Sequence, residues 1–188
     1  DPDWSRGLGD VYKRQGFIGE IKKKGLHETI LLPFQNGVYS EQKISQEFGE
    51  EKTFGAVAQI SSFINENQYV IHKGKLASFF VGNMSDIVNK KLLKFCEISK
   101  NSGLDIQYKS NIKEKIWEKF IFLSAYSGIT TLTKKSIGEI FASTALKDNF
   151  VSAMIETYNL SKFFNVKFKV NPVAVSYTHL RAHETNQD

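Results

Sequence analysis

The feature that most constrains the fold is a change of hydrophobic period near residue 110. Before it, apolar residues come in short runs bounded by turn residues, which is typical of strands. After it, residues 111–126 and 137–164 place apolar side chains three or four positions apart, which is typical of amphipathic helices. The sequence therefore predicts a mixed α/β region over residues 16–109 and an all-helical region over residues 110–174.

Short strands and turns fill the first region. The predicted strands are residues 29–34, 53–60, 68–72, 76–81 and 104–108. The predicted turns lie at residues 35–37, 65–67 and 73–75. Two helices are expected between these strands, one over residues 41–49 and one from an N-cap at Ser85 to a stop at Gly103. Because the strands at residues 53–60, 68–72 and 76–81 follow one another closely, an antiparallel meander or the extension of a sheet is favoured.

Both ends carry peptides that match no fold pattern. Residues 10–15 can be encoded by GATGTGTATAAGAGACAG, and the reverse complement of this DNA, read in another frame, encodes residues 175–179. We therefore expect residues 1–15 and 175–188 to be translated DNA adapter that flanks a fragment of a longer protein, and we expect them to pack poorly. His179 and His183 have the spacing of helical metal ligands but belong to this adapter, so no metal site is predicted.

The composition limits the partners of the chain. Its net charge of +5 is spread along the sequence without a binding motif, so no nucleic-acid partner is expected, although a mildly basic surface suits an anionic cofactor or substrate. No apolar run approaches the roughly 20 residues that span a bilayer, so no membrane segment is expected. The single cysteine, Cys96, excludes an intrachain disulfide framework and fits a reducing cytoplasm. Its apolar helical surroundings predict a buried thiol.

Two stretches resemble the ketopantoate reductase (2-dehydropantoate 2-reductase) family. The first is LPFQNGV, residues 32–38, which looks like the strand and turn that close the family's nucleotide-binding part. The second is NIKEKIWEKFIFLSAYSGITTLTKKSIGEI, residues 111–140, which is similar to the family's first helices after that part: a W-x-K core, a small-residue turn, L-T and then G-E-hydrophobic. Between them, the FGAVAQISSFI, YVIHKGK and FFVG runs are similar to the family's later strands, so the resemblance spans essentially all of residues 16–174.

The resemblance implies an architecture and an activity. It implies that residues 16–109 are the C-terminal part of a Rossmann-type domain that binds NADPH, without its glycine-rich loop. It further implies that residues 110–174 begin an all-helical substrate and dimerisation domain, similar to the C-terminal domain of 6-phosphogluconate dehydrogenase. The implied reaction is the reduction of the 2-keto acid 2-dehydropantoate to pantoate in pantothenate and coenzyme A biosynthesis. We expect a cytoplasmic enzyme and a possible homodimer, and we expect the fragment alone to be inactive.

Lys119 is the candidate catalytic residue. Reducing a keto acid requires a hydride from the cofactor and a proton donor from the protein. Lys119 occupies the W-x-K position, at the edge of the apolar stripe formed by Ile112, Ile116 and Leu123. Partial desolvation there would lower the lysine pKa and make it a better acid. The helix pattern alone favours a surface lysine whose charged end lies in solvent, whereas the resemblance favours catalysis.

Two further site residues are expected from the resemblance. Asn36, in the family's Asn-Gly turn, is expected to contact both cofactor and substrate, although such a turn also forms without a ligand. An asparagine that some members use for substrate binding, four residues after the lysine, is Leu123 here. A second such asparagine corresponds to Ser127, whose hydroxyl can still bind the substrate. Glu139 is interpreted as a helix-capping residue and His72 as structural.

Two alternatives remain open at this point. The leucine at position 123 favours a paralogous reductase that acts on a different 2-keto acid. In the second alternative, the helices form a non-catalytic interaction module and Lys119 has no chemical role.

Overall fold

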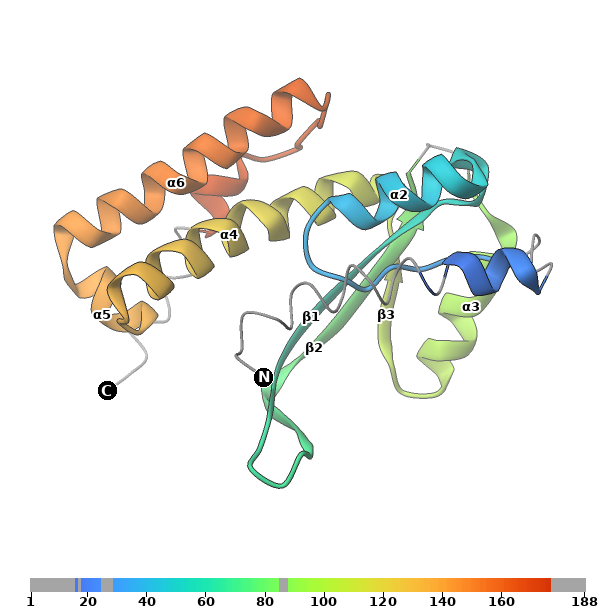
Figure 1. The fold of residues 1–188 in the computed structure, drawn as a ribbon, viewed down its shortest axis with the longest axis horizontal. Coiled ribbons are helices and arrows are strands. Elements are labelled where there is room, and N and C mark those ends of the chain that lie inside the picture. Colours follow the sequence, from blue (N-terminus) through green and yellow to red (C-terminus); the bar gives the residue numbers. More distant parts are fainter. Residues whose placement is uncertain (1–15, 17, 25–28, 85–87, 177–188) are drawn as a thin grey trace.

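The computed structural model describes residues 16, 18–24, 29–84 and 88–176. The elements are α2 (Tyr39–Phe48), η1 (Glu50–Lys52), β1 (Phe54–Ile64), β2 (Val70–Asn83), α3 (Lys90–Asn101), β3 (Asp105–Tyr108), α4 (Ile112–Thr133), α5 (Ile137–Ala142) and α6 (Thr144–Phe163). Figure 1 shows a twisted sheet beside α2 and α3, with α4, α5 and α6 gathered on the other side. The predicted class, mixed α/β followed by helices, is confirmed. A domain boundary at residues 109–110 stays a prediction.

The two predicted adapter segments lie almost entirely outside the described residues. Val175 and Ser176 are the exceptions, and they end a short helical segment over residues 172–176. The expected poor packing of residues 1–15 and 177–188 therefore stays a prediction.

The sheet has three strands in the order β1-β2-β3, and its last pair is parallel. The antiparallel pair β1 and β2 confirms part of the predicted meander. The expected third strand of the meander was wrong, because residues 70–83 form the single strand β2. The helix expected before residues 104–108 is present as α3, and it leads the chain into β3. A crossover through a helix brings the chain back to the same end of the sheet, so β3 runs parallel to β2.

The hairpin between β1 and β2 is longer than predicted. The turn at residues 65–67 is confirmed, since the Asn65 side chain accepts hydrogen bonds from the backbone N–H groups of Asn67 and Tyr69. The turn at residues 73–75 was wrong: Ile60 pairs with Ala77 and Ser62 with His72, so these residues form a bulge inside β2. Gly74 adopts a φ of 78° there. The His72 ring is hydrogen-bonded to the Leu76 carbonyl at 3.0 Å and closes the bulge, which fits its structural interpretation.

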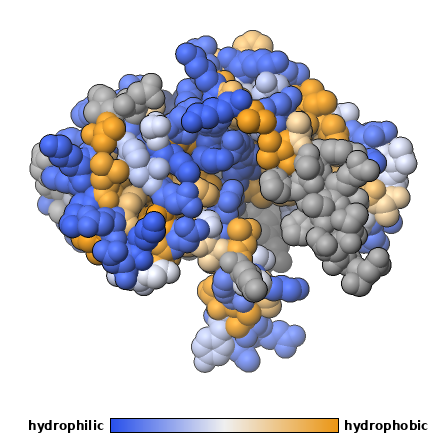
Figure 2. All heavy atoms as spheres, turned by 180° about the vertical axis from the view of Figure 1, so that it is seen from behind, coloured by the Kyte–Doolittle hydropathy of each residue, from blue (hydrophilic) through white to orange (hydrophobic). Residues whose placement is uncertain are grey.

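The hairpin projects from the body and carries exposed apolar side chains. In Figure 2 it extends below the rest of the molecule, with apolar and polar atoms mixed over its surface. The most exposed of these apolar residues are Phe63, Ile64, Tyr69, Val70 and Leu76.

The helix α2 confirms the expected helix at residues 41–49, whereas the strand before it is mostly absent. Residues 29–34 form only one parallel bridge, from Leu31 to Thr53, in place of a full strand. The helix α3 begins later than predicted, at Lys90, with the Asn89 side chain accepting from the Leu92 N–H. The predicted cap Ser85 lies outside the described residues.

The predicted end of α3 and the buried thiol are confirmed. Gly103 adopts a φ of 87°, the left-handed conformation that commonly ends helices. Cys96 is buried, and this burial raises the pKa of its thiol.

The helical region differs from the prediction in two places, at the end of its first helix and within its second. The helix α4 runs through Gly128 to Thr133 and does not end near residue 126. The helix predicted over residues 137–164 is interrupted at Ser143, whose extended backbone separates α5 from α6. Glu139 has its predicted role, since it forms a reciprocal capping box with Ser136 at the start of α5. The hydrogen bonds from Ser136 lower the pKa of the Glu139 carboxyl.

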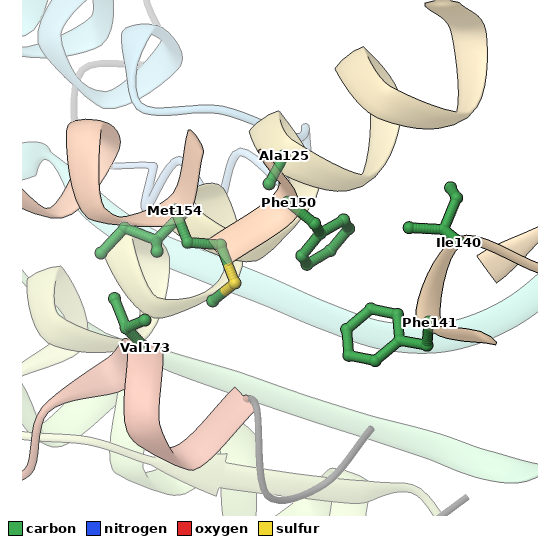
Figure 3. Close-up of a cluster of buried hydrophobic side chains, with 7 residues drawn as sticks. Ala125, Ile140, Phe141, Phe150, Met154 and Val173 are labelled. Atoms are coloured by element: carbon green, nitrogen blue, oxygen red, sulfur yellow. The ribbon is translucent and has the colours of Figure 1, made fainter. Parts of the chain in front are cut away.

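The helix α4 contributes to two separate cores. Its first turns place Ile112 and Ile116 against Val57 of β1. Its later turns place Ile121 and Ala125 among buried side chains of α5, α6 and residue 173. Figure 3 shows this second core, in which Ala125, Phe150, Met154, Phe141 and Ile140 converge from the three helices.

A pair of glycines lets α4 approach the sheet. Gly55 of β1 and Gly82 of β2 are directly paired across the strands. A Cβ at Gly55 would lie 2.6 Å from the Ile116 Cδ1 atom, and a Cβ at Gly82 would lie 2.0 Å from the Lys109 carbonyl oxygen. The absence of side chains at both positions therefore fixes the distance between α4 and the sheet.

The start of α4 also holds the chain segment that follows α6. Asn111 caps α4, and its amide Nδ2 donates to the Lys167 carbonyl at 3.2 Å. The buried Glu114 carboxylate accepts the Lys169 N–H at 2.6 Å. The Lys113 ammonium donates to the Phe164 carbonyl at 2.6 Å. These contacts tie residues 164–169 to the end of α4 that lies on the sheet.

Glu114→Ala should lower the free energy of unfolding by about 1–2 kcal/mol, because the Lys169 N–H and the Asn111 amide lose a buried acceptor. Urea unfolding followed by circular dichroism measures the change. Glu97→Ala is the matched control, since the Lys94–Glu97 pair is exposed on α3 and should contribute less than about 0.5 kcal/mol. Equal effects at the two glutamates would contradict a clamping role for Glu114.

Candidate active site

The helix α4 extends past the sheet, and Lys119 lies at the point where it does so. An α-helix turns by about 100° per residue, so residues three, four or seven positions apart share a side. Ile112 and Ile116 use this side to pack on the sheet. The next positions on the same side are Lys119, Leu123 and Tyr126. We call the side of α4 that carries these three residues the overhang face.

The Lys119 side chain reaches back to the sheet. Its Nζ donates a hydrogen bond of 2.6 Å to the backbone carbonyl oxygen of Ala58 in β1. The side chain is half-buried, and burial lowers the pKa of its ammonium. The partial desolvation predicted for Lys119 is therefore present. The catalytic role itself stays a prediction.

Asn36 lies in the bend between residues 32–35, which belong to no helix or strand, and α2. Its side chain is exposed, and the following Gly37 adopts a φ of 94°, in the region that favours glycine. A Cβ built at Gly37 would meet no atom within 4 Å, so the space in front of this turn is open.

Ser127 is exposed on α4, two turns after Lys119. It is displaced by about 12 Å along the helix axis and by about 80° around it. Within the described part of the chain, no hydrogen bond joins Lys119 to Asn36 or Ser127, and three of its cavities are lined by none of these residues. The roles of Asn36 and Ser127 in binding stay predictions.

Two features near Lys119 were missed from the sequence. The Ala58 carbonyl is a backbone acceptor, which leaves no trace in residue identity. Tyr126 follows Lys119 by seven positions, a helical spacing that could have been recognised. Its ring stacks on Phe122 with a centroid distance of 5.7 Å.

Other potential sites are separate from Lys119. A cavity of about 330 Å³ lies between α2 and the first turns of α4, with Tyr39, Trp117 and Phe164 in its wall. Among the described residues, no cluster of three His, Cys, Asp or Glu side chains is placed to hold a metal. The described helices include none with the length and apolar character to cross a membrane.

The stability difference between the Lys119→Met variant and the original chain should depend on pH. Because burial lowers the Lys119 pKa, the folded chain binds this proton less tightly than the unfolded chain does. The resulting cost to folding is present at neutral pH and disappears as the pH rises toward about 10.4, the pKa of an unfolded lysine.

The advantage of methionine over lysine should therefore shrink between pH 7 and pH 10. Urea unfolding of both chains at the two pH values measures the change. A difference that stays constant with pH would show that Lys119 is fully solvated.

Comparison with known proteins finds matches over both the α/β region and the helical region. Two models of one family match the chain: "Ketopantoate reductase PanE/ApbA" over residues 13–86 and "Ketopantoate reductase PanE/ApbA C terminal" over residues 111–187. The Bacillus subtilis (strain 168) protein YkpB, described as an uncharacterized oxidoreductase, is 25% identical over 135 residues, which cover 72% of this chain and 45% of that protein.

Two solved structures share the fold. The 2-dehydropantoate 2-reductase of Porphyromonas gingivalis W83 matches with a TM-score of 0.72 and 19% identity, over 84% of this chain and 54% of that one. A D-mandelate dehydrogenase solved with NADH matches with a TM-score of 0.73 and 18% identity, over 93% of this chain and 55% of that one. The chain spans about half the length of these relatives. The two family models cover most of both the α/β region and the helical region, and the chain belongs to the ketopantoate reductase family.

Proposed function

We propose that the whole protein containing this chain reduces the keto group of a 2-keto acid with a nicotinamide cofactor. The substrate we favour is 2-dehydropantoate and the cofactor we favour is NADPH. The observation that carries the proposal is the Lys119 ammonium, which is half-buried beside β1 and hydrogen-bonded to the Ala58 carbonyl. Membership of the ketopantoate reductase family supports the same chemistry.

Lys119 acts as the proton donor in this proposal. The bound nicotinamide supplies a hydride to the keto carbon. The Lys119 ammonium gives its proton to the keto oxygen, so that an alcohol forms and a neutral amine remains, which water then reprotonates. Its lowered pKa favours this transfer near neutral pH. Its positive charge stabilises the negative charge that develops on the oxygen.

Binding is assigned to Asn36 in the exposed turn and to Ser127 on α4. The Asn36 amide can both donate and accept hydrogen bonds, which suits the nicotinamide carboxamide and the substrate. The open space in front of Gly37 fits the nicotinamide end of the cofactor. The Ser127 hydroxyl can donate to the substrate carboxylate. The sequence contains no G-x-G-x-x-G loop, so residues beyond these must hold the pyrophosphate.

A second candidate is reduction of a different 2-keto acid. Leu123 lies one turn after Lys119 and has no hydrogen-bonding group to offer a hydroxylated substrate. We also propose that the whole protein works in the cytoplasm and forms a homodimer, with the 2-keto acid as its small-molecule partner.

The test is NADPH oxidation by the whole protein in the presence of 2-dehydropantoate, with NADH as the comparison cofactor. We expect turnover and a preference for NADPH. Calorimetry on the 188-residue chain alone should show no tight NADPH binding, because the pyrophosphate loop is absent. If the whole protein oxidises neither cofactor with any 2-keto acid, the proposal fails and the non-catalytic helical module becomes the better interpretation.

A further inference from the structure

We propose that Asn36 is a site of spontaneous deamidation, and that this modification inactivates the reductase by turning a neutral amide into a carboxylate. The modification is inferred from the structure of the turn that carries Asn36. Its effect on activity rests on the proposed function, in which Asn36 binds cofactor and substrate. The only reactant besides the chain itself is water.

The reaction joins a side-chain amide to the backbone nitrogen that follows it. The Gly37 nitrogen loses its proton to solvent and forms a bond to the Asn36 Cγ atom. The bond from Cγ to Nδ2 breaks, and the nitrogen leaves as ammonia with a proton from solvent. The cyclic succinimide that results takes up water and opens to aspartate or to isoaspartate, in which the backbone passes through the former side chain. No atom is oxidised or reduced in these steps.

The turn leaves both reacting groups accessible. The Asn36 side chain is exposed, and Asn36 and Gly37 lie in a bend outside any helix or strand. Within the described residues, no hydrogen bond holds the Asn36 side chain or the Gly37 N–H. The chemistry can therefore start without breaking a contact of the fold.

The glycine gives the new ring room to close. A side chain on the residue after the asparagine would crowd the ring, and Gly37 has none. A Cβ built there would meet no atom within 4 Å, so the surroundings do not crowd it either. Gly37 has a φ of 94°, and glycine moves between positive and negative φ at little cost. Asn36 is followed by the only glycine that comes directly after an asparagine in the sequence.

Asn101 is the internal comparison for this site. It is also exposed and is also followed by a small residue, Ser102. However, Asn101 ends α3, and the Ser102 N–H donates to the carbonyls of Ile98 and Ser99 at 3.1 Å each. This N–H must leave its acceptors before its nitrogen can attack, so folding should slow deamidation of Asn101 by about fivefold or more.

Deamidation changes what the turn can bind. The Asn36 amide both donates and accepts hydrogen bonds, whereas an aspartate is ionised at neutral pH and only accepts. The new carboxylate offers no donor to the substrate carboxylate and repels it. Isoaspartate also lengthens the backbone just before α2. Losing a hydrogen bond to a charged group should lower kcat/KM by about tenfold or more.

The chemical step is tested on the whole protein without cofactor, incubated at neutral pH with and without guanidinium chloride. Peptide mass spectrometry follows the conversion of each asparagine to an acid. We expect Asn36 to react at nearly the same rate in both conditions, and Asn101 to react about fivefold or more slowly without the denaturant. If folding slows Asn36 as much as it slows Asn101, the turn protects the amide and the modification site is wrong.

The effect on activity is tested on the same incubated sample. Ion exchange separates the intact form from the deamidated form, because the two differ in charge. We expect kcat/KM of the deamidated form to be lower by about tenfold or more, and Asn36→Asp to reproduce this loss. Asn101→Asp is the matched control, because it makes the same change of charge at the exposed end of α3. It should leave kcat/KM unchanged.

The outcomes distinguish this inference from the proposed function. An Asn36 amide that survives the incubation, or a deamidated form as active as the intact form, would overturn the inference and leave keto-acid reduction standing. Fresh protein that reduces no 2-keto acid would overturn the proposed function and the effect on activity with it. The mass measurement would then still decide whether Asn36 is modified.

Discussion

Replacing Lys119 with alanine in the whole protein is expected to lower kcat by about a hundredfold or more. The variant loses both the proton donor and the positive charge beside the keto oxygen. The measurement is steady-state kinetics with 2-dehydropantoate and NADPH. Since Ala58 offers only a carbonyl, no neighbouring group in that contact can replace the donor.

Lys115→Ala is the control for this experiment. Lys115 lies one turn earlier on α4, where it pairs with Glu118 and sits 5.9 Å from the Phe80 ring centroid. These surface contacts contribute little, so kcat should remain nearly unchanged. Equal small effects at Lys115 and Lys119 would mean that Lys119 is an ordinary surface lysine and that the active site lies elsewhere.

Gly82→Ala should be the most destabilising single methyl addition in the sheet. The new Cβ would meet the Lys109 carbonyl oxygen at 2.0 Å, and a backbone atom cannot move aside as a side chain can. We expect the free energy of unfolding to fall by roughly 3 kcal/mol, the upper part of the range for overpacked sites. Urea unfolding of the 188-residue chain, followed by circular dichroism, measures the loss.

Two other glycines make this prediction specific. Gly55→Ala brings its Cβ to 2.6 Å from the flexible end of Ile116, so a smaller loss of about 1–2 kcal/mol is expected. Gly128→Ala in the middle of α4 meets nothing within 4 Å and should raise stability by about 0.5–1 kcal/mol. If all three variants lost similar stability, close packing of α4 on the sheet would not be the cause.

Local patterns predicted most of the elements but only some of their ends. The turn at residues 65–67 and the stop at Gly103 were recognised because a side chain or a glycine determines them locally. The first helix was predicted to end at residue 126, shortly before Gly128, although α4 continues to Thr133. Glycine costs a helix interior about 1 kcal/mol. Packing of the neighbouring Ile129 against the helical core offsets that cost and carries α4 onward. Lys73 to Lys75 resembled a turn, although pairing on both sides keeps them inside one strand.

The candidate site was predicted in part. The helical spacing of the apolar residues placed Lys119 at the edge of an apolar stripe. The structure shows why this edge is half-buried, because α4 crosses β1 there. The position of Asn36 relative to Lys119 could not be predicted, because it depends on the packing between α2, the sheet and α4. No sequence pattern marks the Ala58 carbonyl, because every residue except proline offers the same backbone groups.

Because α4 runs without a break through both hydrophobic cores, it fixes how one core is rotated relative to the other about the helix axis. Ile116 faces the sheet and Ile121 faces the helical core, only five positions later. A single inserted residue between them would turn the helical core by about 100° relative to the sheet and shift it by about 1.5 Å. An insertion of seven residues, about two turns, would leave the two faces nearly in phase. The number of residues between the two isoleucines therefore sets how the helical core is oriented relative to the sheet, and an insertion or deletion there preserves this orientation only if it keeps the helical phase.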